Sequence, residues 1–121
     1  NLNYQSRRLT TTPLFDLVKL LQTFLLGYEC WSEDMNGAGI ASGGFWRNKN
    51  LFQPNKQAIK KIITFYRNLG ITLTAQELSL QLAILMLRIA PYRLSKNITS
   101  ALYCYILATE LLNGELDEFL L

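Results

Sequence analysis

The side chains that could do chemistry in this sequence are few, because the chain contains no histidine. That absence removes the usual Ser-His-Asp and Cys-His forms of nucleophilic catalysis and the H-E-x-x-H zinc motif. Ser95 and Lys96 are adjacent, but neighbours in a helix do not face each other, so a Ser-Lys dyad is not expected. The sequence therefore predicts no catalytic residues and no enzymatic activity.

The acidic residues nearest a polar loop are Glu29, Glu33 and Asp34. On a continuing helix Glu29 and Glu33 would share a face, and two carboxylates so placed could hold Mg²⁺ together with substrate phosphates. Hard cations need more oxygen ligands than these residues supply, so a solvated helix end is the favoured interpretation. We expect no metal site.

A glycine-rich stretch, Gly37-Ala-Gly-Ile-Ala-Ser42, invites comparison with phosphate-binding loops. It has serine where the dinucleotide fingerprint needs its third glycine, and it lacks the G-K-[ST] ending of a Walker loop. Five of the seven glycines lie between Gly27 and Gly44. We therefore interpret residues 36–50 as a long loop that carries glycine, aromatic and basic residues, and we expect no cofactor.

The two cysteines, Cys30 and Cys104, are too far apart in sequence for a C-x-x-C motif. Two free thiols in a reducing, cytoplasmic compartment are the favoured interpretation, and a single bridge in an oxidising compartment is the alternative.

Charge is distributed unevenly, although the net charge is only +3. Residues 35–76 carry six basic and no acidic side chains, whereas residues 110–121 carry four acidic ones. Lys56, Lys60 and Arg67 fall within about 40° of one another on a helical wheel, which makes a row suited to a phosphate backbone. Aromatic residues in the preceding loop could stack on unpaired bases of RNA or single-stranded DNA. The predicted nucleic-acid-binding residues are Trp46, Arg47, Lys49, Lys56, Lys60, Lys61 and Arg67.

The same features have a plainer interpretation. A basic face opposite an apolar one is common on amphipathic helices, where it is simply solvated or meets an acidic protein. Phe45 and Trp46 could likewise plug the core. A protein-interaction module or assembly factor with an acidic protein partner is therefore the alternative function.

Length and periodicity predict a single all-α domain over residues 1–121, a small bundle of about four main helices. Strand signals are weak. We expect residues 1–12 to form a polar arm and residues 115–121 an acidic tail. The predicted helices run from Pro13 to about Leu26, from near Pro54 to before Gly70, from a capping box at Thr74 to Pro91, and from about Ser95 to before Gly114.

The third and fourth predicted helices are apolar around most of their circumference. A small bundle encloses about one such helix, so we expect the surplus to contact other protein subunits or a second copy of the chain. No apolar run approaches the ~18 residues that span a bilayer. The expected function is that of a non-enzymatic helical subunit of a larger assembly, of the kind found in ribonucleoproteins or CRISPR effector complexes.

Overall fold

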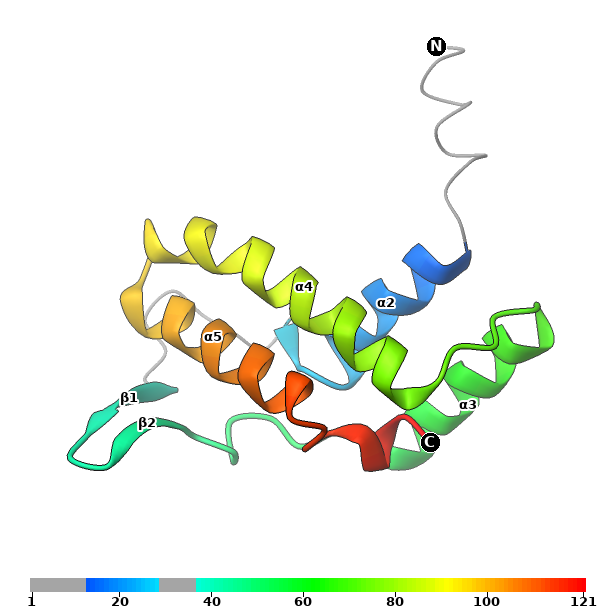
Figure 1. Ribbon diagram of the computed structural model, residues 1–121, viewed down its shortest axis with the longest axis horizontal. Coiled ribbons are helices and arrows are strands. Elements are labelled where there is room, and N and C mark those ends of the chain that lie inside the picture. Colours follow the sequence, from blue (N-terminus) through cyan, green and yellow to red (C-terminus); the bar gives the residue numbers. More distant parts are fainter. Residues whose placement is uncertain (1–12, 29–36) are drawn as a thin grey trace, which may run out of the picture.

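A computed structural model of the chain describes residues 13–28 and 37–121. The predicted arm 1–12 and the acidic cluster near residues 29–34 lie outside the described residues. Within the described part the protein is mostly helical, as predicted, with a small two-stranded sheet (Figure 1). The elements are α2 (Pro13–Phe24), β1 (Ala38–Ala41), β2 (Gly44–Arg47), α3 (Lys56–Asn68), α4 (Ala75–Leu94), α5 (Ile98–Leu112) and the 3-10 helix η2 (Asp117–Phe119).

The first two predicted helices end where their glycines indicated. After α2 the chain continues one turn to Gly27, which adopts a φ of +68° that favours glycine. The side chain of Asn55 caps α3 by accepting a hydrogen bond from the backbone of Ala58. Gly70, at a φ of +100°, follows the end of α3.

The capping box of α4 is present, but the predicted end of this helix is wrong. Thr74 accepts from the backbone of Glu77, and the Glu77 carboxylate accepts from the backbone of Thr74. Pro91 lies inside the helix, which continues to Leu94. Proline adopts helical φ, but it lacks the amide donor and its ring crowds the carbonyl of the residue four positions earlier. Because Pro91 is exposed, water can satisfy the carbonyl that loses this bond.

The predicted start of α5 is also shifted. The helix begins at Ile98, and its N-cap is Asn97, whose side chain accepts from the backbone of Ser100. Ser95 instead lies at the C-terminal cap of α4, where its hydroxyl donates to the carbonyl of Tyr92. Ser95 therefore caps the preceding helix and does not start the next one.

The long loop predicted for residues 36–50 contains an antiparallel hairpin, which the sequence interpretation missed. Ala38 pairs with Arg47 and Ala41 with Gly44, so only Ser42 and Gly43 form the turn. Each strand has four residues, too few to produce a clear alternating pattern. The hairpin packs beside α5, which supplies the stabilisation that a lone hairpin lacks.

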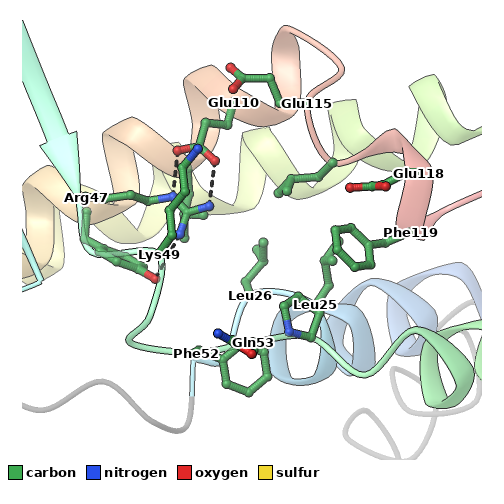
Figure 2. A pocket seen from close by; sticks show the side chains of 14 residues that line it. Leu25, Leu26, Arg47, Lys49, Phe52, Gln53, Glu110, Glu115, Glu118 and Phe119 are labelled. Carbon is green, nitrogen blue, oxygen red and sulfur yellow. Dashed lines mark hydrogen bonds and ion pairs between the residues drawn. The ribbon is translucent and has the colours of Figure 1, made fainter.

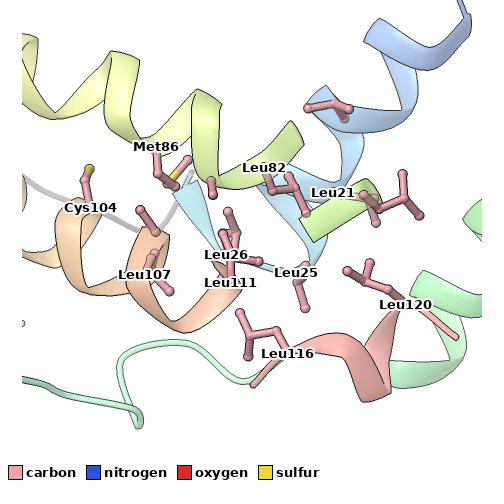
Figure 3. Close-up of a cluster of buried hydrophobic side chains, with 14 of the residues drawn as sticks. Leu21, Leu25, Leu26, Leu82, Met86, Cys104, Leu107, Leu111, Leu116 and Leu120 are labelled. Carbon is pink, nitrogen blue, oxygen red and sulfur yellow. The ribbon is translucent and has the colours of Figure 1, made fainter. Parts of the chain in front are cut away.

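The core lies between the helices, and α4 and α5 pack against each other along their lengths (Figure 1). α2 packs against both α3 and α4. Figure 3 shows leucines from α2, α4, α5 and the C-terminal segment meeting in one cluster. Within the described ranges, no helix is long and apolar enough to cross a membrane.

The segment predicted as an acidic tail is part of this core. Leu116 and Leu120 are buried, and the hydroxyl of Ser79 on α4 donates to the carboxylate of Asp117 over 2.8 Å. Leu116 and Leu120, which flank η2, therefore dock the C-terminus beside α3 and α4. Glu115 and Glu118 remain exposed.

Candidate nucleic-acid interface

The outward face of α3 carries the basic side chains that the sequence singled out. Ile59 and Ile63 are buried against the core. Lys60, Lys61 and Arg67 are exposed on the other side. The helix is therefore amphipathic as predicted, because apolar and basic residues alternate with the helical period.

The cations of α3 differ in their surroundings. Lys56 lies 3.5 Å from the Glu118 carboxylate and 5.6 Å from the ring centre of Phe119. Both members of that ion pair are more than 60% exposed, so water screens it and it contributes little to stability. Lys60, Lys61 and Arg67 form no ion pair with any carboxylate in the part of the chain that the structure describes. Their charges are therefore available to an external anion.

A shallow groove runs along this face of α3, beside the free cations. Phe65 is 58% exposed and meets Tyr66 edge to face, with ring centres 5.3 Å apart. Sequence reasoning placed Phe65 on the apolar arc, but at the margin of that arc the residue is more than half exposed. The groove combines amide, hydroxyl, ammonium and aromatic groups. Its lining residues are Gln57, Lys60, Lys61, Thr64, Phe65 and Asn68.

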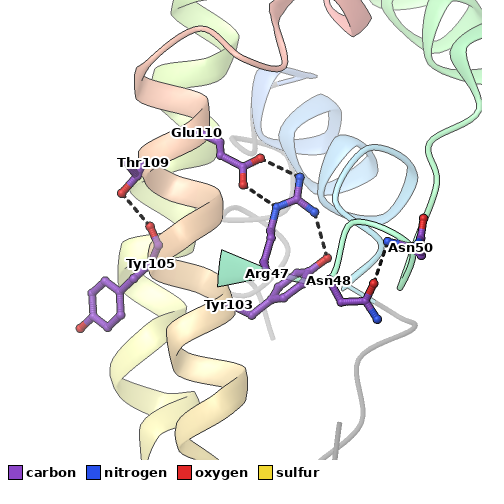
Figure 4. Close-up of polar contacts among 7 residues, drawn as sticks. All are labelled: Arg47, Asn48, Asn50, Tyr103, Tyr105, Thr109 and Glu110. Atoms are coloured by element: carbon purple, nitrogen blue, oxygen red, sulfur yellow. Dashed lines mark hydrogen bonds and ion pairs between the residues drawn. The ribbon is translucent and has the colours of Figure 1, made fainter. Parts of the chain in front are cut away.

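Arg47, a predicted nucleic-acid contact, is engaged inside the protein. Its guanidinium makes two hydrogen bonds of 2.6 Å to the two carboxylate oxygens of Glu110, and it donates to the hydroxyl of Tyr103 at 3.5 Å (Figure 4). The Arg47 and Glu110 side chains are each only 10% exposed. Since Glu110 neutralises Arg47 and the pair is largely buried, we leave Arg47 out of the candidate interface.

Burial and the ion pair set the protonation of this cluster. Burial lowers the pKa of Arg47, but the hydrogen bonds and charge of Glu110 outweigh that effect and raise the pKa above its ordinary value. Burial raises the pKa of Tyr103, while the charge of Arg47 opposes the rise. The raised pKa values keep Arg47 charged and the Tyr103 phenol neutral at neutral pH.

Lys49 lies in a region of mixed charge. A cavity of about 240 Å³ opens between β2, the C-terminal segment and the end of α2, and Lys49 lines it with Glu115 and Glu118 (Figure 2). The nearby carboxylates make this mouth a poor site for a phosphate, because they repel anions. Phe52 and Phe119 also line the cavity and contribute apolar surface to it.

Trp46 covers the neighbouring strand. It pairs with Gly39 across the hairpin. A Cβ added at Gly39 would lie 2.8 Å from the indole ring, so the ring occupies the space that glycine leaves. The hairpin and α3 lie at opposite ends of the molecule (Figure 1). The aromatic and basic residues that the sequence grouped together therefore do not form one surface.

The described residues contain no group of three or more histidine, cysteine or acidic side chains that could hold a metal ion. Glu29, Glu33 and Asp34, the acidic residues weighed for Mg²⁺, lie outside the described residues. Cys30 also lies outside the described residues, and within them Cys104 is a buried thiol that forms no disulfide. Its burial raises its pKa to about 12, although the charge of Arg93 acts in the opposite direction.

Fold and surface together define a small helical domain with a basic face on α3 and a short hairpin held to α5 by an ion pair. No protein-family model, no curated protein and no solved structure matches this chain.

Proposed function

We propose that this chain is a non-enzymatic subunit of a larger assembly and that it binds the backbone of RNA or single-stranded DNA through the outward face of α3. One observation carries the proposal: Lys60, Lys61 and Arg67 are exposed on one helix without an ion-pair partner among the described residues. The exposed ring of Phe65 lines the same groove as Lys60 and Lys61. Cations that hold phosphates and a ring that stacks on a base are the two components of single-strand binding.

The contacts of such a surface would be to phosphates, so binding would be largely independent of sequence. Three cations that neutralise three phosphates contribute a slope of about −2 to log affinity against log salt concentration on single strands. Loss of a stacking ring costs about 1–3 kcal/mol per base. The salt dependence of binding thus measures the phosphate contacts, and removal of the ring measures the contribution of base stacking.

The test compares two variants with the same change in net charge. Lys60→Glu/Lys61→Glu reverses two charges on the proposed face, and Lys19→Glu/Lys49→Glu reverses two exposed charges elsewhere. Binding to a fluorescent single-stranded oligonucleotide is measured by anisotropy over a range of salt concentrations. We expect the first variant to lose affinity and salt dependence, and the control to lose much less.

Phe65→Ala should weaken binding to single strands more than binding to duplex, with little change in stability because the ring is half exposed. Trp46→Ala is the contrasting variant, since its ring covers Gly39; we expect it to lower the melting temperature and leave binding unchanged. If reversing Lys60 and Lys61 alters neither affinity nor salt slope, the nucleic-acid proposal fails. An acidic protein would then be the preferred partner for this face.

A further inference from the structure

The outward face of α4 carries an apolar stripe in the described structure. Leu80, Ile84, Leu87 and Leu94 follow one another at spacings of four, three and seven residues, which keeps them on one side of a helix. Their side chains are 43% to 53% exposed. Four large apolar residues in one row on a single helix form a continuous apolar patch, which differs from single exposed residues scattered over a surface.

α5 carries a second stripe. Ile98, Tyr105 and Leu112 are spaced seven residues apart and are 44% to 72% exposed. Figure 4 shows Tyr105 pointing away from the Arg47–Glu110 pair, which lies on the inner side of α5. The stripe is therefore on the outer side of the helix.

The two stripes face the same side of the α4–α5 pair. α2 borders one edge of α4. We take the small buried residues Ala83 and Ala90 to mark the other edge of α4, next to α5. Ala101 and Ala108, which are also buried, mark the corresponding edge of α5. At 100° per residue, the alanines of each helix lie about 40–80° from its stripe around the helix axis. The direction of this rotation is the same in both helices. Because α4 and α5 run antiparallel (Figure 1), both stripes then point to one common face.

This outer face is nearly symmetrical about its middle. Leu94 and Ile98 lie at the connected ends of the two helices. Leu87 lies seven residues before Leu94, and Tyr105 lies seven residues after Ile98, which is about 10 Å along each helix. Leu87 and Tyr105 are therefore level with each other, and each has apolar residues at similar distances on both sides.

We infer that the outer face of α4 and α5 binds the same face of a second copy of this chain, around a twofold axis at the level of Leu87 and Tyr105. An isologous interface needs a surface that is complementary to itself. The twofold axis places Leu80 opposite Leu94 of the second copy, and Ile98 opposite Leu112 of the second copy. Each helix then packs antiparallel on its own copy, and apolar residues cover apolar residues throughout.

The charges at the ends of the face fit this arrangement. Glu77 lies in the first turn of α4, and Lys96 lies just beyond the end of that helix. Both are exposed. The twofold axis that centres the stripes brings Glu77 close to Lys96 of the second copy, and the reverse pair forms at the other end. Glu77 and Arg88 lie within about 20° of each other on α4, at the edge toward α2, where Arg88 lines a groove with Phe15.

The first experiment measures the mass of the full chain by sedimentation velocity over a range of concentrations. We expect a monomer–dimer equilibrium. Leu87→Glu places two carboxylates near the axis and should raise the dimer dissociation constant roughly tenfold or more. Leu69→Glu is the matched control, because Leu69 is 55% exposed and lies at the C-terminal cap of α3, outside both stripes; this variant should dimerise normally.

The second experiment tests register and charge. Tyr105→Cys should cross-link to its copy under mild oxidation, because it lies on the axis, whereas Ile98→Cys should not. Lys96→Glu should weaken the dimer, and adding Glu77→Gln, which keeps the capping box, should restore part of the affinity. A chain that stays monomeric at all concentrations, or a dimer that Leu87→Glu leaves intact, would overturn the inference. This outcome is independent of the α3 proposal, whose variants lie on another helix.

Discussion

At the scale of single residues, the ion pair between Arg47 and Glu110 is a largely buried polar contact with two hydrogen bonds of 2.6 Å. It joins β2 to α5 across 63 positions of sequence. A buried pair contributes little net stability compared with well-packed apolar residues, but removing one partner leaves an uncompensated charge inside the protein. The pair therefore acts mainly to fix where the hairpin docks.

Glu110→Ala should lower the free energy of unfolding by about 3–5 kcal/mol, because Arg47 then stays buried without its carboxylate. The double variant Arg47→Met/Glu110→Leu should lose much less, since no charge remains to desolvate. Glu118→Ala, which breaks the exposed pair with Lys56, is the control and should cost roughly 0–1 kcal/mol. Urea unfolding measures all three, and equal losses for Glu110→Ala and Glu118→Ala would contradict the prediction.

Cys104 makes stability depend on alkaline pH. Its folded-state pKa of about 12 lies above the ordinary value of 9.0 because burial disfavours the thiolate. A raised pKa stabilises the fold fully below the unfolded-state value, and the contribution is lost as the pH rises from 9 toward 12. The free energy of unfolding should therefore fall more steeply for the wild type than for Cys104→Ala in this window. If denaturant titrations give the same pH dependence of the free energy of unfolding for both proteins, the prediction is wrong.

At the scale of elements, the helices follow local signals, whereas the hairpin depends on its neighbours. Asn55, Thr74 and Asn97 cap three helices through their own side chains, and such caps are visible in sequence. The hairpin has two strands of four residues and becomes stable only when it packs on α5. Its glycines suggested a loop because glycine is common in both loops and tight turns.

Gly39→Ala should destabilise the hairpin by about 1–3 kcal/mol, because the new methyl group would overlap the Trp46 ring. Gly43→Ala is the matched control in the turn, where a Cβ meets no atom within 4 Å. Tryptophan fluorescence and thermal unfolding report the difference. Gly39→Ala/Trp46→Leu should recover part of the loss, and an unaltered melting temperature for Gly39→Ala would show that the ring does not pack there.

At the scale of the whole molecule, the two proposed interactions use different surfaces: the basic face of α3 and the apolar outer face of α4 and α5. They lie on different helices, so one subunit could bind a strand and a second copy at the same time. Covering the apolar face removes exposed hydrophobic area from water, which is the main source of affinity in such interfaces.

Dimerisation predicts that thermal stability depends on protein concentration. A partner that binds only the folded chain stabilises it by mass action, so the melting temperature of the wild type should rise by several degrees over a hundredfold increase in concentration. Leu87→Glu should melt at the same temperature throughout that range. Scanning calorimetry makes the measurement, and a wild-type melting temperature that does not change with concentration would argue against the dimer.

Sequence alone determined the four helices to within a few residues, the amphipathic character of α3 and the surplus of apolar surface, because caps, glycines and helical periodicity act over a few residues. It grouped Trp46 and Arg47 with the cations of α3 because they are close in sequence. Only the tertiary structure placed Arg47 against Glu110, separated the hairpin from α3 and brought the stripes of α4 and α5 onto one face. These outcomes depend on contacts between residues distant in the chain, and no local pattern encodes which distant residues will meet.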